Sequence, residues 1–210
     1  ELIKVLTKKA NTDDKMIDKI FDYTLHKIYF QNGYYDFDTG VFNKTDYNSF
    51  VIIPNEFHFK PNAEIRKEIY ERILNPIFTI YDEDIECKKE REELRDYFLY
   101  KMARIVAGNI EDKEWVINLG FRDCGKGCLT DLFINCFKNY CCNANAESFL
   151  LKSNSGDSAK NNSFMADWSF KRVVFMNECS TSDDKNNKCV LDGNKIKKII
   201  SGGDYVTVRT

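Results

Sequence analysis

The sequence of 210 residues predicts an α/β fold, and three observations in its second half support this prediction. Residues 115–119 form a short apolar run that is typical of a buried strand. A glycine-rich segment follows at 120–127, and an amphipathic helical pattern begins directly after it. Residues 172–176 form a second apolar run, which ends in polar residues. Strands that alternate with amphipathic helices indicate a sheet covered by helices.

The first half predicts a mixed α+β, mostly helical region that contains a β-meander. Apolar spacing predicts a helix over 12–26, and short aromatic runs with turns between them predict a meander over 27–42. Two further helices are expected at 62–74, where Asn75 and Pro76 end or kink the helix, and at about 90–107. Because Gly108 and Asn109 stop the last helix, we expect one region over 1–108 and a second over 109–210.

Composition and charge exclude several functional classes. Hydrophobic residues make up 43% of the chain, which is enough for a packed core. With 31 Lys and Arg against 33 Asp and Glu, any contact with nucleic acid must come from a local patch. No apolar run approaches the roughly 18 residues of a membrane-spanning helix. We interpret Asp36 and Asp38 as turn residues, not as metal ligands.

The eight cysteines are interpreted as reduced, mostly buried residues of a cytosol-like compartment. None of them forms a C-x-x-C pair, and the two histidines, His26 and His58, lie far from the cysteine cluster. A zinc site is therefore weakly supported.

The strongest motif is Gly-x-x-x-x-Gly-Lys at residues 120–126, the phosphate-binding loop pattern. Glycines let backbone N–H groups turn inward around an anion, and the N-terminus of the following helix adds partial positive charge. Lys126 supplies a full charge for β- and γ-phosphates. The residues expected to bind the nucleotide are Gly120, Cys124, Gly125, Lys126, Gly127 and Cys128.

The general pattern has Ser or Thr where this chain has Gly127, and that hydroxyl ordinarily binds Mg²⁺. Thr130, one helical turn later, could replace it, as could a water molecule. Asn177 and Glu178 follow the second apolar run, where a phosphate-loop ATPase places groups that orient the metal and polarise the attacking water. Glu178 is therefore the candidate base, and Asn177, Glu178 and Thr130 are the candidate metal ligands.

Residues 193–209 combine a basic helical turn, a glycine turn and an apolar strand pattern. Lysines beside an aromatic residue suit the backbone of a single-stranded nucleic acid, and the candidates for this contact are Lys197, Lys198 and Arg209. Each motif also has a plain structural interpretation: a glycine turn beside a surface lysine, a solvated strand end, and a solvated helix face.

In this order, these segments resemble the superfamily 3 helicases, most closely the primase–helicases of poxviruses and giant viruses. Residues 30–36 are similar to that family's Phe-x-Asn-Gly-x-Tyr-Asp stretch, and 107–109 to its Ala-Gly-Asn before the ATPase core. The giant-virus branch often has Gly-x-Arg-x-x-Gly-Lys-Gly, which residues 120–127 match. Asn177 and Glu178 are similar to the Walker B motif, and 196–209 to the motif of the DNA-contacting hairpin.

The resemblance implies an AAA+-like ATPase core that uses ATP and Mg²⁺ to move along single-stranded DNA as a homo-oligomeric, hexameric ring. It further implies a role in viral DNA replication and an intracellular location, in the host cytoplasm or a viral replication factory. The family's sensor strand and arginine finger would follow Thr210, so we expect a truncated core that hydrolyses ATP poorly by itself.

Two other functions remain open from the sequence. The chain could be another phosphate-loop enzyme, such as a small-molecule kinase, although such an enzyme predicts an arginine-rich lid after the second strand. Only Arg209 lies there. The chain could also be a non-catalytic interaction module with an incidental glycine loop.

Overall fold

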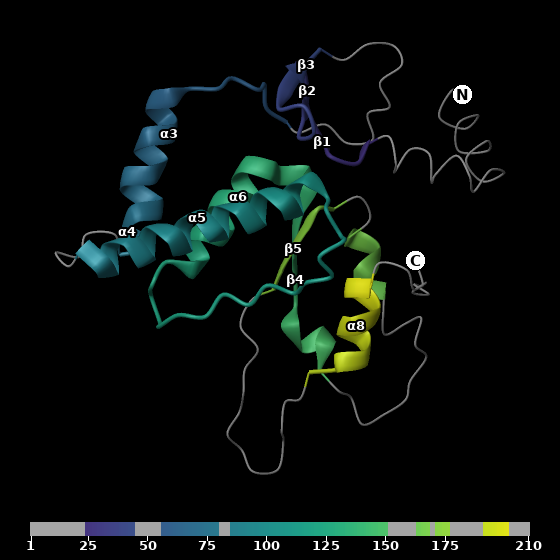
Figure 1. Cartoon of the computed structure of the whole chain (residues 1–210). Helices are drawn as coiled ribbons and strands as arrows, with labels where there is room; N and C mark the ends of the chain where they lie inside the picture. The colour runs from purple at the N-terminus through teal and green to yellow at the C-terminus, as the bar shows by residue number, and fades with distance from the viewer. Residues whose placement is uncertain are drawn as a thin grey trace.

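A computed structural model shows a mixed α/β fold with helices and two small sheets (Figure 1). The structure describes residues 24–44, 56–79, 85–150, 163–168, 171–176 and 191–201. The predicted helix over 12–26 lies mostly outside these residues, as does the predicted strand after Gly203. Within them, a mixed α/β class is confirmed.

The expected β-meander is present as a three-stranded antiparallel sheet in the order β1-β2-β3. Its strands are β1 (Lys27–Phe30), β2 (Gly33–Asp36) and β3 (Val41–Asn43). At the β2–β3 turn, Asp36 Oδ1 accepts the backbone N–H groups of Asp38 at 2.9 Å and Thr39 at 3.3 Å. This is the turn chemistry that the sequence predicts for Asp36.

A helical arm follows, with α3 (Ala63–Ile69), a π-helical turn (Tyr70–Leu74) and α4 (Asn75–Ile77). The side chain of Asn62 caps α3 by accepting the N–H groups of Glu64 and Ile65. The predicted disruption at Asn75 and Pro76 takes the form of the π turn, where Asn75 N–H donates to the Tyr70 carbonyl. Because proline lacks an N–H group, a local change of hydrogen-bond register is expected there.

The long helix α5 (Ile85–Ala107) starts earlier than predicted and ends where expected. Gly108 ends it with φ of 88°, a left-handed conformation that favours glycine. Its N–H donates to the Ile105 carbonyl at 2.9 Å, and Asn109 N–H donates to the Arg104 carbonyl at 3.0 Å.

The second half holds α6 (Lys126–Phe137), β4 (Cys141–Ala144), β5 (Val173–Met176) and α8 (Gly193–Ser201). Strands β4 and β5 pair in parallel, so their carboxyl ends lie at the same edge. The predictions of a helix after the glycine loop, of a strand near 172–176 and of a helix before Gly202 are confirmed. Short 3₁₀ helices lie at Lys138–Tyr140, Ala146–Phe149 and Ser163–Trp168.

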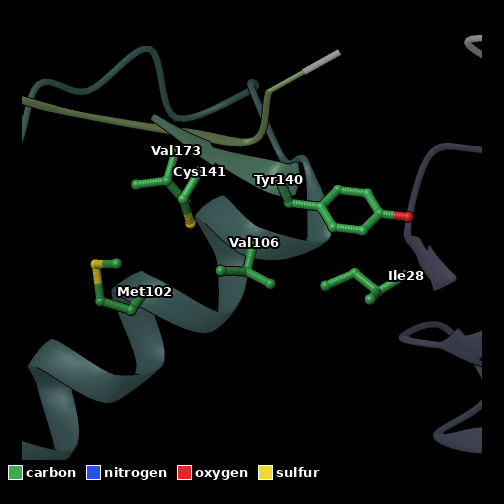
Figure 2. Packing of buried hydrophobic residues seen from close by; sticks show 6 residues of the cluster. All are labelled: Ile28, Met102, Val106, Tyr140, Cys141 and Val173. Carbon is green, nitrogen blue, oxygen red and sulfur yellow. The ribbon is translucent and has the colours of Figure 1, made fainter. Parts of the chain in front are cut away.

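One cluster of buried side chains joins α5 to the meander and to both parallel strands (Figure 2). Its members are Ile28, Met102, Val106, Tyr140, Cys141 and Val173. The Tyr140 hydroxyl accepts the backbone N–H of Tyr29 at 2.9 Å, and Figure 2 shows the ring pointing toward the meander. Residues from both sides of the predicted boundary at 108/109 therefore share a core, and the boundary itself stays a prediction.

The predicted strand over 115–119 is wrong. These residues have no regular structure, and Ile117 and Leu119 are 66% and 90% exposed. The preceding acidic residues are tied to α5, since Lys101 Nζ donates to Glu114 at 2.6 Å and Arg104 forms two hydrogen bonds with Asp112. These ion pairs hold the start of the segment beside α5.

The cysteines are less buried than predicted. In the described residues only Cys141 is fully buried, whereas Cys87, Cys124 and Cys142 are half-buried and Cys128 and Cys136 are exposed. Helical residues such as Cys128 follow the period of α6, so the side of the helix they occupy decides their exposure.

Candidate phosphate-binding loop

The glycine-rich segment forms a loop that runs directly into α6. Gly125 is the last residue before the helix and has φ of 90°, where a side chain would be strained. Its carbonyl accepts the N–H of Leu129 at 3.1 Å, which starts the helical hydrogen bonding. Lys126 is therefore the first residue of α6, as the motif predicts.

The Lys126 side chain turns back over the loop that precedes it. Its ammonium donates to the carbonyl oxygens of Gly120 at 2.8 Å and Phe121 at 2.7 Å. The same Nζ lies 3.3 Å from Cys124 Sγ. Three loop residues thus surround the charge that the motif assigns to phosphate binding, which places that charge inside the curve of the loop.

The side chains of Cys124 and Lys126 occupy the space beside Gly120 on the inner side of this curve. A Cβ atom at this position would lie 2.7 Å from Cys124 Sγ and 3.7 Å from Lys126 Nζ. A larger residue at this position would therefore collide with the Cys124 thiol.

The start of α6 is also suited to an anion. Gly125 has no side chain that could cap the first N–H groups, and the first turn has no acidic residue. A helix of 12 residues concentrates partial positive charge at this end. The lysine and the helix start thus place positive charge close together, and the loop carbonyls of Gly120 and Phe121 face the ammonium.

Gly127 provides no hydroxyl group, and a Cβ atom built on this residue would meet no atom within 4 Å. Thr130 Oγ1 donates to the Lys126 carbonyl at 3.2 Å, one turn into the helix. No group of three or more His, Cys, Asp or Glu side chains that could hold a metal occurs in the described ranges. Asn177, Glu178 and Thr130 remain predictions as metal ligands.

The other predicted residues are placed only in part. Asn177 and Glu178 follow the last residue of β5 and lie outside the described residues, as does Arg209. Lys197 and Lys198 are exposed on α8, and their contact with nucleic acid stays a prediction. Lys195 instead faces the protein, since its Nζ donates to the Ser148 carbonyl at 2.8 Å.

Two contacts of the loop region were not predicted. The ion pairs of Asp112 and Glu114 with α5 fix the chain before the loop, and the hydrogen bond from Arg104 lowers the pKa of Asp112. The spacing of Lys101 and Arg104 on one helix face, with an acidic run shortly afterwards, was a usable signal. The second contact is between Gly125 and Ile77, for which the sequence gives no signal.

No family model, curated protein or solved structure matches the chain. The resemblance to superfamily 3 helicases and the nucleotide site are therefore proposals that depend on the motifs and on the loop geometry. Among the helices that the structure describes, none is both long and apolar enough to cross a membrane.

Proposed function

We propose that residues 120–127 bind the phosphates of ATP and that the chain is an ATP-dependent DNA helicase of the superfamily 3 type. The geometry of Lys126 is the observation that supports this most directly. Its ammonium lies within the loop, 2.8 Å from the Gly120 carbonyl, at the start of a 12-residue helix.

The residues present fit a nucleoside triphosphate. Gly120 and Gly125 carry no side chain of their own in the loop, and Lys126 supplies the charge for the β- and γ-phosphates. Glu178 is the proposed base, which would orient and polarise a water molecule, and Asn177 or Thr130 would help to hold Mg²⁺. Bound Mg²⁺ would neutralise charge on the phosphates.

The proposed DNA contact is on α8 and the segment after it. Lys197 and Lys198 are exposed on neighbouring positions of this helix, and Arg209 follows it in the sequence. Positive side chains that track a phosphate backbone are typical of proteins that bind single strands without sequence preference. The working form that this function requires is a homo-oligomeric ring, acting in viral DNA replication.

Equilibrium binding of a fluorescent ATP analogue tests the nucleotide site. We expect Lys126→Ala to weaken binding by about tenfold or more, because a charge-assisted contact with phosphate is lost. Lys88→Ala is the matched control, since Lys88 is an exposed lysine on α5. Equal affinity of the wild type and Lys126→Ala would contradict the proposal, provided that both variants have the thermal stability of the wild type.

A further inference from the structure

The end of the helical arm, residues 63–79, lies against the phosphate-binding loop. A Cβ atom built on Gly125 would lie 2.5 Å from Ile77 Cγ1, 3.0 Å from Cδ1 and 3.4 Å from Cγ2. The three atoms nearest to that position thus all belong to one side chain of α4. In Figure 1 the chain after α5 returns toward the end of the molecule where α4 lies, and α6 begins there.

This contact falls on Gly125, whose backbone has a left-handed conformation. Gly125 has φ of 90° and directly precedes Lys126, so its backbone sets the direction of the lysine and of the first N–H groups of α6. Ile77 is half-buried and packs where any larger residue at 125 would have to go. A branched side chain at this place restricts how far the Gly125 backbone can move.

The arm itself is fixed to α5, so Ile77 is not on a free end. Arg95 Nη1 donates to Asn75 Oδ1 at 2.8 Å, and the Arg95 guanidinium lies 5.1 Å from the centre of the Tyr70 ring. The rings of Phe78 and Phe98 are 5.6 Å apart. Residues on both sides of Ile77 are therefore held by α5.

The contact continues from α5 to α6. The ring of Phe98 meets the ring of Phe133 edge to face, with centroids 6.0 Å apart. The arm thus approaches α6 at two places. Ile77 lies against Gly125, the residue before the first turn of α6. Further along, Phe98 of α5 contacts both Phe78 of the arm and Phe133 of α6. A π-helical turn just before α4 is a feature often found where a helix serves a functional site.

We propose that Ile77 is a positioning residue of the nucleotide site, which holds the Gly125 backbone in the conformation that binds phosphate. This inference rests on the proposed function, because it concerns how well the same loop binds a nucleotide. Ile77 acts through Gly125 and needs no contact with the ligand. It follows that nucleotide binding and the arrangement of the arm are coupled, and that each affects the other.

The test compares Ile77→Ala with Ile73→Ala, which removes an equal volume from another half-buried isoleucine of the arm. We expect Ile77→Ala to weaken binding of the fluorescent ATP analogue about fivefold or more, as is usual for coupled sites. Ile73→Ala should bind like the wild type. Ile77→Val keeps Cγ1 and Cγ2 and should restore most of the affinity, which a merely structural loss would not predict.

Hydrogen exchange on the wild type gives a second readout that needs no variant to fold. Added ATP should slow exchange at residues 73–79 as well as in the loop. Protection of the loop alone, or full affinity of a folded Ile77→Ala variant, would overturn the inference and leave the nucleotide site in place. Absence of ATP binding by the wild type would overturn the proposed function and this inference together.

Discussion

Single residues decide how the two halves of this protein meet. Gly108 ends α5 with φ of 88°, and a side chain at this position would collide with the Arg172 guanidinium. Arg172 Nη2 in turn donates to the Thr24 carbonyl at 2.8 Å, and burial lowers the pKa of Arg172. The half-buried Arg172 guanidinium thus occupies a place that the absence of a side chain at residue 108 leaves open.

Gly108→Ala should therefore destabilise the protein. We expect the free energy of unfolding to fall by about 2–3 kcal/mol, since the substitution adds both backbone strain and a collision. Gly193→Ala is the matched control, because a Cβ there would meet no atom within 4 Å. Chemical denaturation measures both variants, and equal stability of the two would show that the Gly108–Arg172 contact is unimportant.

At the scale of elements, the segment before the loop is held by charge. Arg104 binds both carboxylate oxygens of Asp112, at 2.8 and 3.0 Å, and Lys101 binds Glu114. After these ion pairs, Trp115 packs edge to face on Phe149, with ring centroids 5.5 Å apart. The apolar residues that follow are exposed, with Phe121 at 91%.

Loss of the Arg104 side chain should free this segment. We expect Arg104→Ala to be cut by chymotrypsin at Leu119 and Phe121 about two to five times faster than the wild type, because the ion pairs oppose local opening. Arg91→Ala removes another exposed arginine of α5 and should leave the cleavage rate unchanged. If both variants were cut at the wild-type rate, the ion pairs would not hold the segment.

Local sequence predicts several elements correctly, but it also predicts a strand over 115–119 that the structure does not have. The period of α6, the turn at Asp36 and the stop at Gly108 are each set by neighbouring residues, so they could be predicted. The run over 115–119 has the composition of a strand, but a strand also needs a partner at its edge. Here Lys101 and Arg104 bind the adjacent acidic residues, and this competing contact is not visible in the apolar pattern.

At the scale of the whole molecule, stability depends on the core shared by α5, the meander and the two parallel strands. Because this core contains the Cys141 thiol, the stability of the fold is sensitive to alkaline pH. Burial, the largest cause, raises the pKa of the Cys141 thiol from 9.0 to about 12. The folded protein therefore keeps this proton when the unfolded chain has lost it. The contribution to stability is complete below about pH 9 and is lost between about pH 9 and 12.

We expect the free energy of unfolding to fall through this range by on the order of 1 kcal/mol per pH unit from Cys141 alone. Cys141→Val has a similar volume and no proton to lose, so its stability should decline less steeply. Denaturation curves at several pH values measure the difference. Parallel pH profiles for the two proteins would contradict a buried, protonated thiol at this position.

The sequence predicts the positions of Lys126 and of α6 better than it predicts which residues pack around them. The motif located Lys126 and the start of α6, because glycine, lysine and helix period are local signals. It could not place Ile77 against Gly125, since these residues are far apart in the chain and no pattern links them. Nor could it predict the core that joins Ile28 to Val173, which depends on how distant elements pack.

Calorimetric titration with adenosine, AMP, ADP and ATP tests most directly whether the loop recognises phosphate. In the wild type we expect affinity to rise with each added phosphate, because Lys126 and the N–H groups of α6 act on the β- and γ-phosphates. In Lys126→Ala this dependence should be lost. Equal affinity for adenosine and ATP in the wild type, or the same series of affinities in both proteins, would contradict a phosphate-binding loop at residues 120–127.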